Sequence, residues 1–163
     1  MKTDSKGIFI AGILLLIVGL CFFIASRLRL PQAIEADFSA IYRQIKSDEL
    51  MGSARLGNEA ELKRNFNILP SSFQEMLYLA PDNFMEVDEL LLLRFSSEES
   101  AVAIRDSMEK RLTSLMNNFE SYGTDQYSLL QKAQIYQNDA YICYTAGHFG
   151  YELMQLLRSH IER

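Results

Sequence analysis

The chain has 163 residues, 48% of them hydrophobic, and a formal net charge of −5. Residues 30–163 hold 12 Lys and Arg against 20 Asp and Glu, and an acidic domain repels phosphate backbones, so nucleic-acid binding is disfavoured. Two cysteines exclude a disulfide scaffold. We expect an N-terminal tail and anchor over 1–29 and a single globular domain over 30–163, because about 130 residues make one domain of ordinary size.

Residues 7–25 contain no charge, Asn, Gln or Pro. A helix of about 20 apolar residues spans a bilayer, so this stretch predicts a transmembrane helix in contact with membrane lipid. A cleaved signal peptide fits less well, because Phe23 or Ile24 would stand three residues before the cut, where a small residue is wanted. A lipoprotein signal is also disfavoured, because the bulky Leu20 precedes Cys21.

The orientation of this span is not decided by its flanking charges. Lys2 and Lys6 lie before it, and Arg27 and Arg29 lie after it. A short tail ahead of the first span is typical of an uncleaved signal-anchor, which favours a domain exported from the cytoplasm.

Hydrophobic periodicity and turn residues predict the elements that follow. Helices are expected over 33–48, 59–66, 97–122, about 125–132 and 149–162, and strands over 74–80, 89–95, 133–137 and 140–146. The short, bounded run Leu90–Leu93 indicates a strand buried on both faces. The order predicts an α+β domain with an antiparallel sheet of about four strands and helices on one face.

The long helix carries its own boundary signals. Ser96 and Glu99 have the spacing of a capping box, and Gly123 is expected to end the helix.

The predicted C-terminal hairpin carries three tyrosines and a cysteine. Simple alternation places Tyr141 on the face opposite Tyr136 and Tyr144, so these rings serve either the core or an aromatic binding face. Cys143 lies between apolar neighbours, and we expect it to be buried, reduced and unreactive. The alternative is a thiol–imidazole pair with His148.

Three segments resemble a bacterial family, the domain of unknown function 4358. They are DELLLLRF (88–95), EKRLTSLMNNFESY (109–122) and DAYICYTA (139–146), and they contain Glu89, Arg111, Tyr122 and Tyr141. The resemblance implies an extracytoplasmic domain tethered by a lipid or by one N-terminal helix. The family has no established activity, so the resemblance implies a location and no reaction.

No catalytic motif, cofactor loop or metal-ligand spacing is evident in the sequence. His148 and His160 are too far apart for a paired ligand motif, and the carboxylates of 86–89 are expected in a solvated loop. We therefore expect a non-enzymatic domain that binds another cell-envelope component. The alternatives are a sensor with a small-molecule or peptide pocket between sheet and helices, and an enzyme acting on envelope polymers.

Geometry predicts one specific contact. The strand from Glu89 rises about 23 Å before the long helix begins, and about fifteen helical residues retrace that distance. This brings Arg111, at the edge of the apolar stripe, close to Glu89, as a structural pair worth about 1 kcal/mol or less if exposed.

Overall fold

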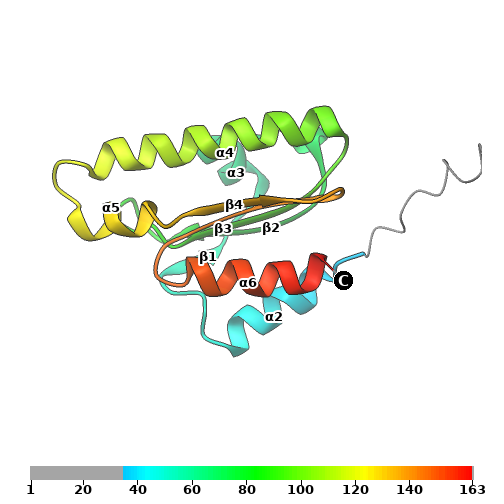
Figure 1. Ribbon diagram of the computed structural model, residues 1–163, viewed down its shortest axis with the longest axis horizontal. Coiled ribbons are helices and arrows are strands. Elements are labelled where there is room, and N and C mark those ends of the chain that lie inside the picture. The colour runs from blue at the N-terminus through cyan, green and yellow to red at the C-terminus, as the bar shows by residue number, and fades with distance from the viewer. Residues whose placement is uncertain (1–34, 163) are drawn as a thin grey trace, which may run out of the picture. The chain divides into compact units, whose positions relative to one another are not determined.

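The computed structural model describes residues 35–162, which form five α-helices and one five-stranded antiparallel sheet (Figure 1). The helices are α2 (Phe38–Ser47), α3 (Glu59–Phe66), α4 (Glu98–Phe119), α5 (Thr124–Leu130) and α6 (Gly150–Ile161). The strands are β1 (Ala54–Leu56), β2 (Phe73–Pro81), β3 (Glu89–Phe95), β4 (Gln134–Gln137) and β5 (Tyr141–Ala146), in the order β1-β2-β3-β5-β4. A 3₁₀ turn, η1 (Pro70–Ser72), leads into β2.

The middle strand, β3, is buried on both faces, as predicted. Leu90, Leu91, Leu92 and Leu93 are fully buried. Successive side chains of a strand point to opposite faces, so Leu91 and Leu93 join one core and Leu90 and Leu92 join another. β3 is therefore shared by both layers of the domain.

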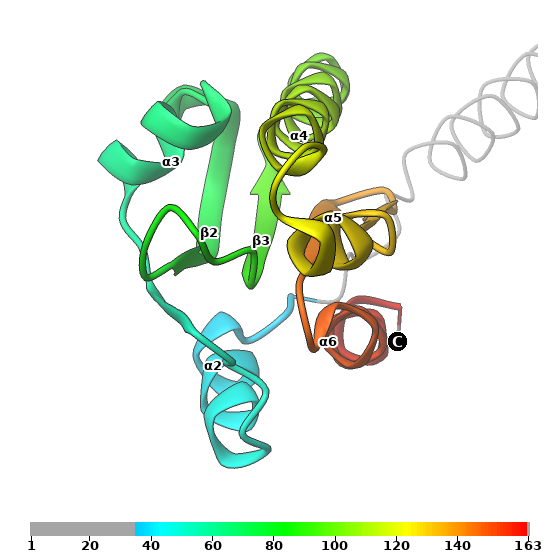
Figure 2. The same cartoon turned by 90° about the vertical axis from the view of Figure 1, so that its left-hand side faces the viewer.

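Helices cover both faces of the sheet, which corrects the expectation of helices on one face. The core on one side is built with α3, α4 and α5, and the core on the other side with α2 and α6 (Figures 1 and 2). A strand whose two faces are both apolar requires cover on both faces, so the leucine run already carried this information.

Three further details differ from expectation. The sheet has a fifth strand, β1, which is only three residues long. The N-cap of α4 is Ser97, whose side chain accepts from the Ser100 amide, so the expected capping box from Ser96 is wrong. The helix ends at Phe119, and Gly123 is instead the N-cap residue of α5.

The predicted anchor, residues 7–25, lies outside the described residues. Within residues 35–162, no helix has both the length and the apolar character needed to cross a membrane.

Candidate functional site

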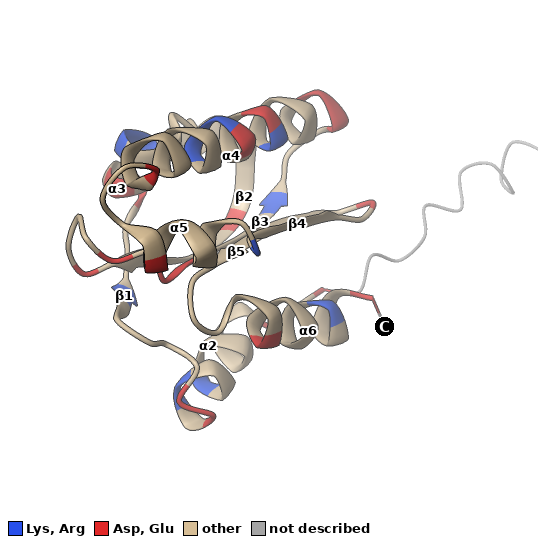
Figure 3. Ribbon diagram, turned by 60° about the vertical axis from the view of Figure 1, so that its left-hand side comes forward, with Lys and Arg blue, Asp and Glu red and all other residues tan. Residues whose placement is uncertain are grey.

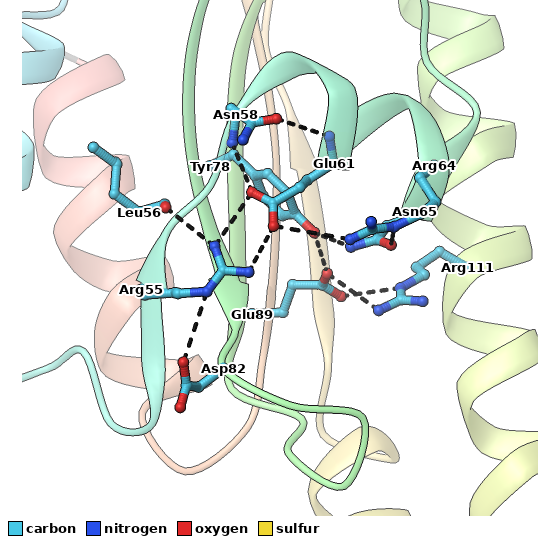
Figure 4. A network of polar contacts seen from close by, with 10 residues as sticks. All are labelled: Arg55, Leu56, Asn58, Glu61, Arg64, Asn65, Tyr78, Asp82, Glu89 and Arg111. Atoms are coloured by element: carbon cyan, nitrogen blue, oxygen red, sulfur yellow. Dashed lines mark hydrogen bonds and ion pairs between the residues drawn. The ribbon is translucent and has the colours of Figure 1, made fainter.

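Two consecutive carboxylates at the start of β3 form the polar centres of the domain. Glu89 faces α3 and α4, and its side chain is completely buried. Arg111 on α4 donates from Nε to Oε2 at 3.2 Å and from Nη2 to Oε1 at 3.3 Å (Figure 4). The predicted contact between these two residues is therefore present, and the burial of Glu89 makes it a different interaction from an exposed pair.

Tyr78 and Asn65 complete the coordination of Glu89. The Tyr78 hydroxyl donates to Glu89 Oε1 at 2.8 Å and accepts from Asn65 Nδ2 at 2.7 Å. The Arg111 guanidinium also lies over the Phe66 ring, 5.8 Å from its centroid. The network thus joins α3, β2, β3 and α4 through one carboxylate.

Burial sets the protonation of this network. Desolvation raises the pKa of Glu89, and Arg111 and Tyr78 oppose that increase. Desolvation also raises the pKa of Tyr78 and of the neighbouring Tyr144, so both phenols remain protonated at neutral pH. The Tyr144 hydroxyl is buried and has no hydrogen-bond partner among the described residues.

An exposed group of charges lies at the rim of the same network (Figure 4). Arg55 on β1 contacts Glu61 Oε1 at 2.6 Å, and this hydrogen bond lowers the pKa of Glu61. Glu61 also completes a capping box with Asn58 at the start of α3. These contacts attach α3 to β1 at the surface.

Asp88 is the second polar centre, and two loops hold its side chain on the opposite side of β3 from Glu89. It accepts from the Ser53 amide at 3.0 Å and the Ser53 hydroxyl at 3.0 Å. It also accepts from the His148 amide at 2.7 Å, and it lies 3.0 Å from His148 Nδ1. Burial would raise the pKa of Asp88, but the hydrogen bonds from Ser53 and His148 outweigh it and leave the pKa lowered.

Two glycines make room for this carboxylate. Gly52 has φ +55° and Gly147 has φ +99°, conformations that side chains rarely adopt. A Cβ at either position would collide with the Asp88 side chain, and one at Gly147 would also meet the Asp88 backbone. The glycines therefore turn the two loops so that the amides of the following residues reach one acceptor.

The expectation of a solvated loop over 86–89 is wrong. Asp88 and Glu89 are buried, and Glu86 accepts from the Ser53 hydroxyl at 2.9 Å. The donors come from positions 35 and 60 residues away, which is why local sequence did not reveal them. The sequence did contain one indication of this centre: a glycine precedes each residue that donates to Asp88, at Gly52-Ser53 and at Gly147-His148.

Both carboxylates are held by hydrogen bonds from neighbouring elements, and neither forms the serine–histidine–carboxylate order of a catalytic triad. Both oxygens of Glu89 are engaged by Arg111, and Oε1 also by Tyr78. Asp88 lies between Ser53 and His148, whereas activation of a serine needs the imidazole between the hydroxyl and the carboxylate. Across residues 35–162, no group of His, Cys, Asp and Glu is placed to hold a metal ion.

Cys143 is buried, as predicted. Its Sγ lies 3.6 Å from Met154 Sδ, and desolvation raises its pKa to about 12. His148 instead contacts Asp88, so the structure gives these two residues separate partners and does not form the thiol–imidazole pair. Unreactive behaviour in solution stays a prediction.

The hairpin tyrosines do not form a shared binding face. Tyr141 packs with Cys143 in the core on the α6 side, and its hydroxyl accepts from the Ala36 amide at 2.9 Å. Tyr136 packs against that same core, whereas Tyr144 belongs to the core on the α4 side. Tyr136 and Tyr144 therefore lie on opposite faces of the sheet, and the prediction that they share a face is wrong. Tyr136 pairs with Cys143 across a two-residue turn, and paired residues point to the same face, so Tyr136 shares the face of Cys143 and Tyr141.

Tyr122 lies outside both polar centres. It follows α4, is 70% exposed, and its ring is tilted against Phe119 with centroids 6.0 Å apart. Of the four residues singled out in the sequence, only Glu89 and Arg111 are brought together.

The fold and its two polar centres define a small α+β domain in which two buried carboxylates tie helices and loops to the central strand. Residues 47–147 match the family model described as Domain of unknown function (DUF4358), and the chain belongs to this family. A search of curated proteins and a search of solved structures each gave no match.

Proposed function

We propose that this chain is a membrane-anchored, extracytoplasmic domain that binds another component of the cell envelope without catalysing a reaction. The binding surface that we assign is the loop between β2 and β3. The observation that carries the proposal is Phe84, which is 86% exposed beside the 38% exposed Met85. Phe and Met are enriched at protein–protein interfaces, so two adjacent exposed side chains of these types support a binding surface here.

The loop that presents Phe84 is held in place. Asn83 accepts from the Met85 amide through Oδ1 at 2.9 Å and from the Glu86 amide through its carbonyl at 3.3 Å. Glu86 then contacts Ser53, which also donates to Asp88. The Asp88 centre therefore fixes the base of the loop, and an ordered loop loses less conformational entropy on binding.

The position of this loop also supports the proposal. The described chain enters beside the end of β3, where Glu35 and Arg94 are 2.9 Å apart, whereas the Phe84 loop precedes the start of β3. The seven residues of β3 separate the two ends by about 23 Å. The Phe84 loop therefore lies at the end of β3 opposite to the end that Glu35 contacts.

The cavities give less support to the sensor alternative. Within the described residues, a cavity of about 10 Å³ lies between the sheet and α6, which is room for about one water molecule. Two hollows of about 530 and 340 Å³ lie on the surface, over the outer face of α4 and beside the end of β3, and both are wide open. Ligand pockets usually enclose most of the ligand.

Crosslinking from native membranes tests the binding surface. Phe84→Ser should abolish crosslinking to the partner. The variant should still fold, because the Phe84 ring is exposed and contributes little to the core. Val102→Ser is the matched control, since Val102 is an exposed apolar residue (68%) on α4. Capture of the same partner by the Phe84→Ser variant would contradict the assigned surface.

The anchor and its orientation are tested separately. Full-length protein should stay in the membrane pellet after alkaline carbonate washing, and release or a mature N-terminus beyond Ser26 would refute the anchor. Protease added to intact protoplasts should remove the globular domain. Protection in intact protoplasts, with digestion after lysis, would reverse the orientation.

A further inference from the structure

The two edges of the sheet differ in how they are protected against pairing. β1 is three residues long, and its Arg55 is engaged by Glu61 at 2.6 Å and Asp82 at 3.7 Å. Short strands and charged side chains are the usual means of blocking an edge. The other edge, β4, contains four residues without charge or proline, Gln134–Gln137 (Figure 3).

The backbone groups that β4 leaves open can be assigned. The Asn138 amide donates to the Tyr141 carbonyl at 2.9 Å, so these residues form a hydrogen-bonded pair. Such pairs alternate along an antiparallel ladder, which makes Tyr136↔Cys143 the next one. Ile135 and Gln137 therefore direct their N–H and C=O groups away from β5, where no other described strand lies.

We propose that β4 pairs antiparallel with β4 of a second copy of this chain, around a two-fold axis at Tyr136. The outward residues Ile135 and Gln137 are two apart, so a two-fold rotation places Ile135 of each copy opposite Gln137 of the other. Each such pair exchanges two backbone hydrogen bonds, about four in all. The two five-stranded sheets become one continuous sheet.

Self-complementarity identifies a second copy as the occupant. At the axis, Tyr136 faces its own counterpart, and cross-strand aromatic pairs are favourable. Beyond the strand, Ala133 of one copy meets Asp139 of the other, which brings Lys132 beside an opposite charge. No like charges face each other along the paired strands, which meets the requirement of an isologous interface.

Side chains on both faces hold this edge in position. The Arg158 guanidinium lies 4.7 Å from the Tyr136 ring centroid, and Glu162 contacts Arg158 at 2.7 Å and offsets its charge near the axis. On the other face, Arg105 donates to Gln137 Oε1 at 3.3 Å. The interface is small, so we expect a reversible dimer whose population depends on concentration.

Disulfide crosslinking of the full-length, detergent-solubilised chain tests the register. In a background that carries both Cys21→Ser and Cys143→Ala, so that the new thiol has no cysteine opposite it on β5, Tyr136→Cys places two thiols at a non-hydrogen-bonded pair between copies. The Cα atoms of that pair are about 4.5 Å apart, within disulfide range. Gln134→Cys is the control, because its two copies would be about 14 Å apart along the strands. A covalent dimer with Tyr136→Cys alone is expected, and equal crosslinking of both variants overturns the proposed register.

A proline substitution tests the hydrogen bonds independently. Gln137→Pro removes an outward N–H and leaves the β4–β5 ladder intact, since proline is tolerated on an open edge. Light scattering after size exclusion should show loss of the dimer for Gln137→Pro and a dimer for Gln137→Ala. A monomeric wild-type chain, a dimeric Gln137→Pro variant, or one copy bound to a different polypeptide would each overturn the proposal.

Discussion

At the scale of single residues, Arg111 matters because it neutralises a carboxylate that has no access to water. Arg111→Ala should lower the free energy of unfolding by about 3–5 kcal/mol, because Glu89 is left buried and uncompensated. The Glu89→Ala, Arg111→Ala double variant should lose less than the sum of the single losses. Urea unfolding of the four proteins measures this coupling.

The control for this cycle lies on the same helix. Lys110 and Asp106 are 2.7 Å apart, but both side chains are mostly exposed. Their coupling should be about 0.5 kcal/mol or less. Strictly additive losses for Glu89 and Arg111 would show that their contact contributes no coupling energy.

The lowered pKa of Asp88 makes stability depend on pH. A carboxyl whose pKa is lower in the folded state stabilises the fold above its unfolded pKa, and this contribution is lost as the pH falls through the folded value. Asp88→Asn should therefore cost about 1.5–3 kcal/mol near neutral pH, and the deficit should shrink below about pH 4. Urea titrations across this range measure the difference.

Asp82→Asn serves as the matched variant, since Asp82 is an exposed carboxylate just after β2. We expect it to change stability little at any pH. A deficit for Asp88→Asn that stayed constant between neutral and acidic pH would argue against the charged hydrogen bonds as its cause.

The two polar centres differ in how far the sequence revealed them. The Glu89–Arg111 contact followed from the rise of a strand and the rise of a helix, because only one tight connection separates them. The Asp88 centre depends on how distant loops meet at the end of β3, which no local pattern encodes. Its buried carboxylate was therefore mistaken for part of a solvated loop.

At the scale of elements, the start of α4 provides a direct comparison between adjacent serines. Ser97 caps the helix by accepting from the Ser100 amide at 3.1 Å. Ser97→Ala should cost about 1 kcal/mol in the free energy of unfolding, whereas Ser96→Ala should cost much less. A larger loss for Ser96→Ala in urea unfolding would restore the cap predicted from sequence.

The hairpin shows why faces are harder to predict than strands. Both strands were located within one residue, yet Tyr136 was placed on the wrong face. Across a two-residue turn, each odd-numbered residue pairs with an even-numbered one. Two even-numbered residues on the two strands, such as Tyr136 and Tyr144, therefore point to opposite faces. The turn length, more than the composition, therefore decides which tyrosines meet.

At the scale of the whole molecule, two hydrophobic cores share one strand. Met108 lies in the core on the α4 side and Leu157 in the core on the α6 side, and both are fully buried. Met108→Ala and Leu157→Ala should each cost about 2–5 kcal/mol and shift a single unfolding transition. Circular dichroism and tyrosine fluorescence should report the same midpoint for each variant.

Separate transitions in either variant would mean that the two layers unfold independently. We expect one transition because β3 supplies leucines to both cores, so neither core survives the loss of that strand. The sequence predicted that β3 is buried on both faces, but we expected all helices on one face. Which face each helix covers depends on the order of the strands in the sheet, and the sequence pattern did not give that order.

The leucine run of β3 has a further consequence for how the chain finds its pairing. If β3 slipped by one residue, leucines from Leu90–Leu93 would still face both cores, so hydrophobicity alone does not fix the register of this strand. Asp88 and Glu89 remove the ambiguity. A slip of one residue would turn each carboxylate to the opposite face of the sheet, away from its hydrogen-bond partners and among apolar side chains. The two acids therefore fix the register of β3, because each finds its hydrogen-bond partners in only one alignment.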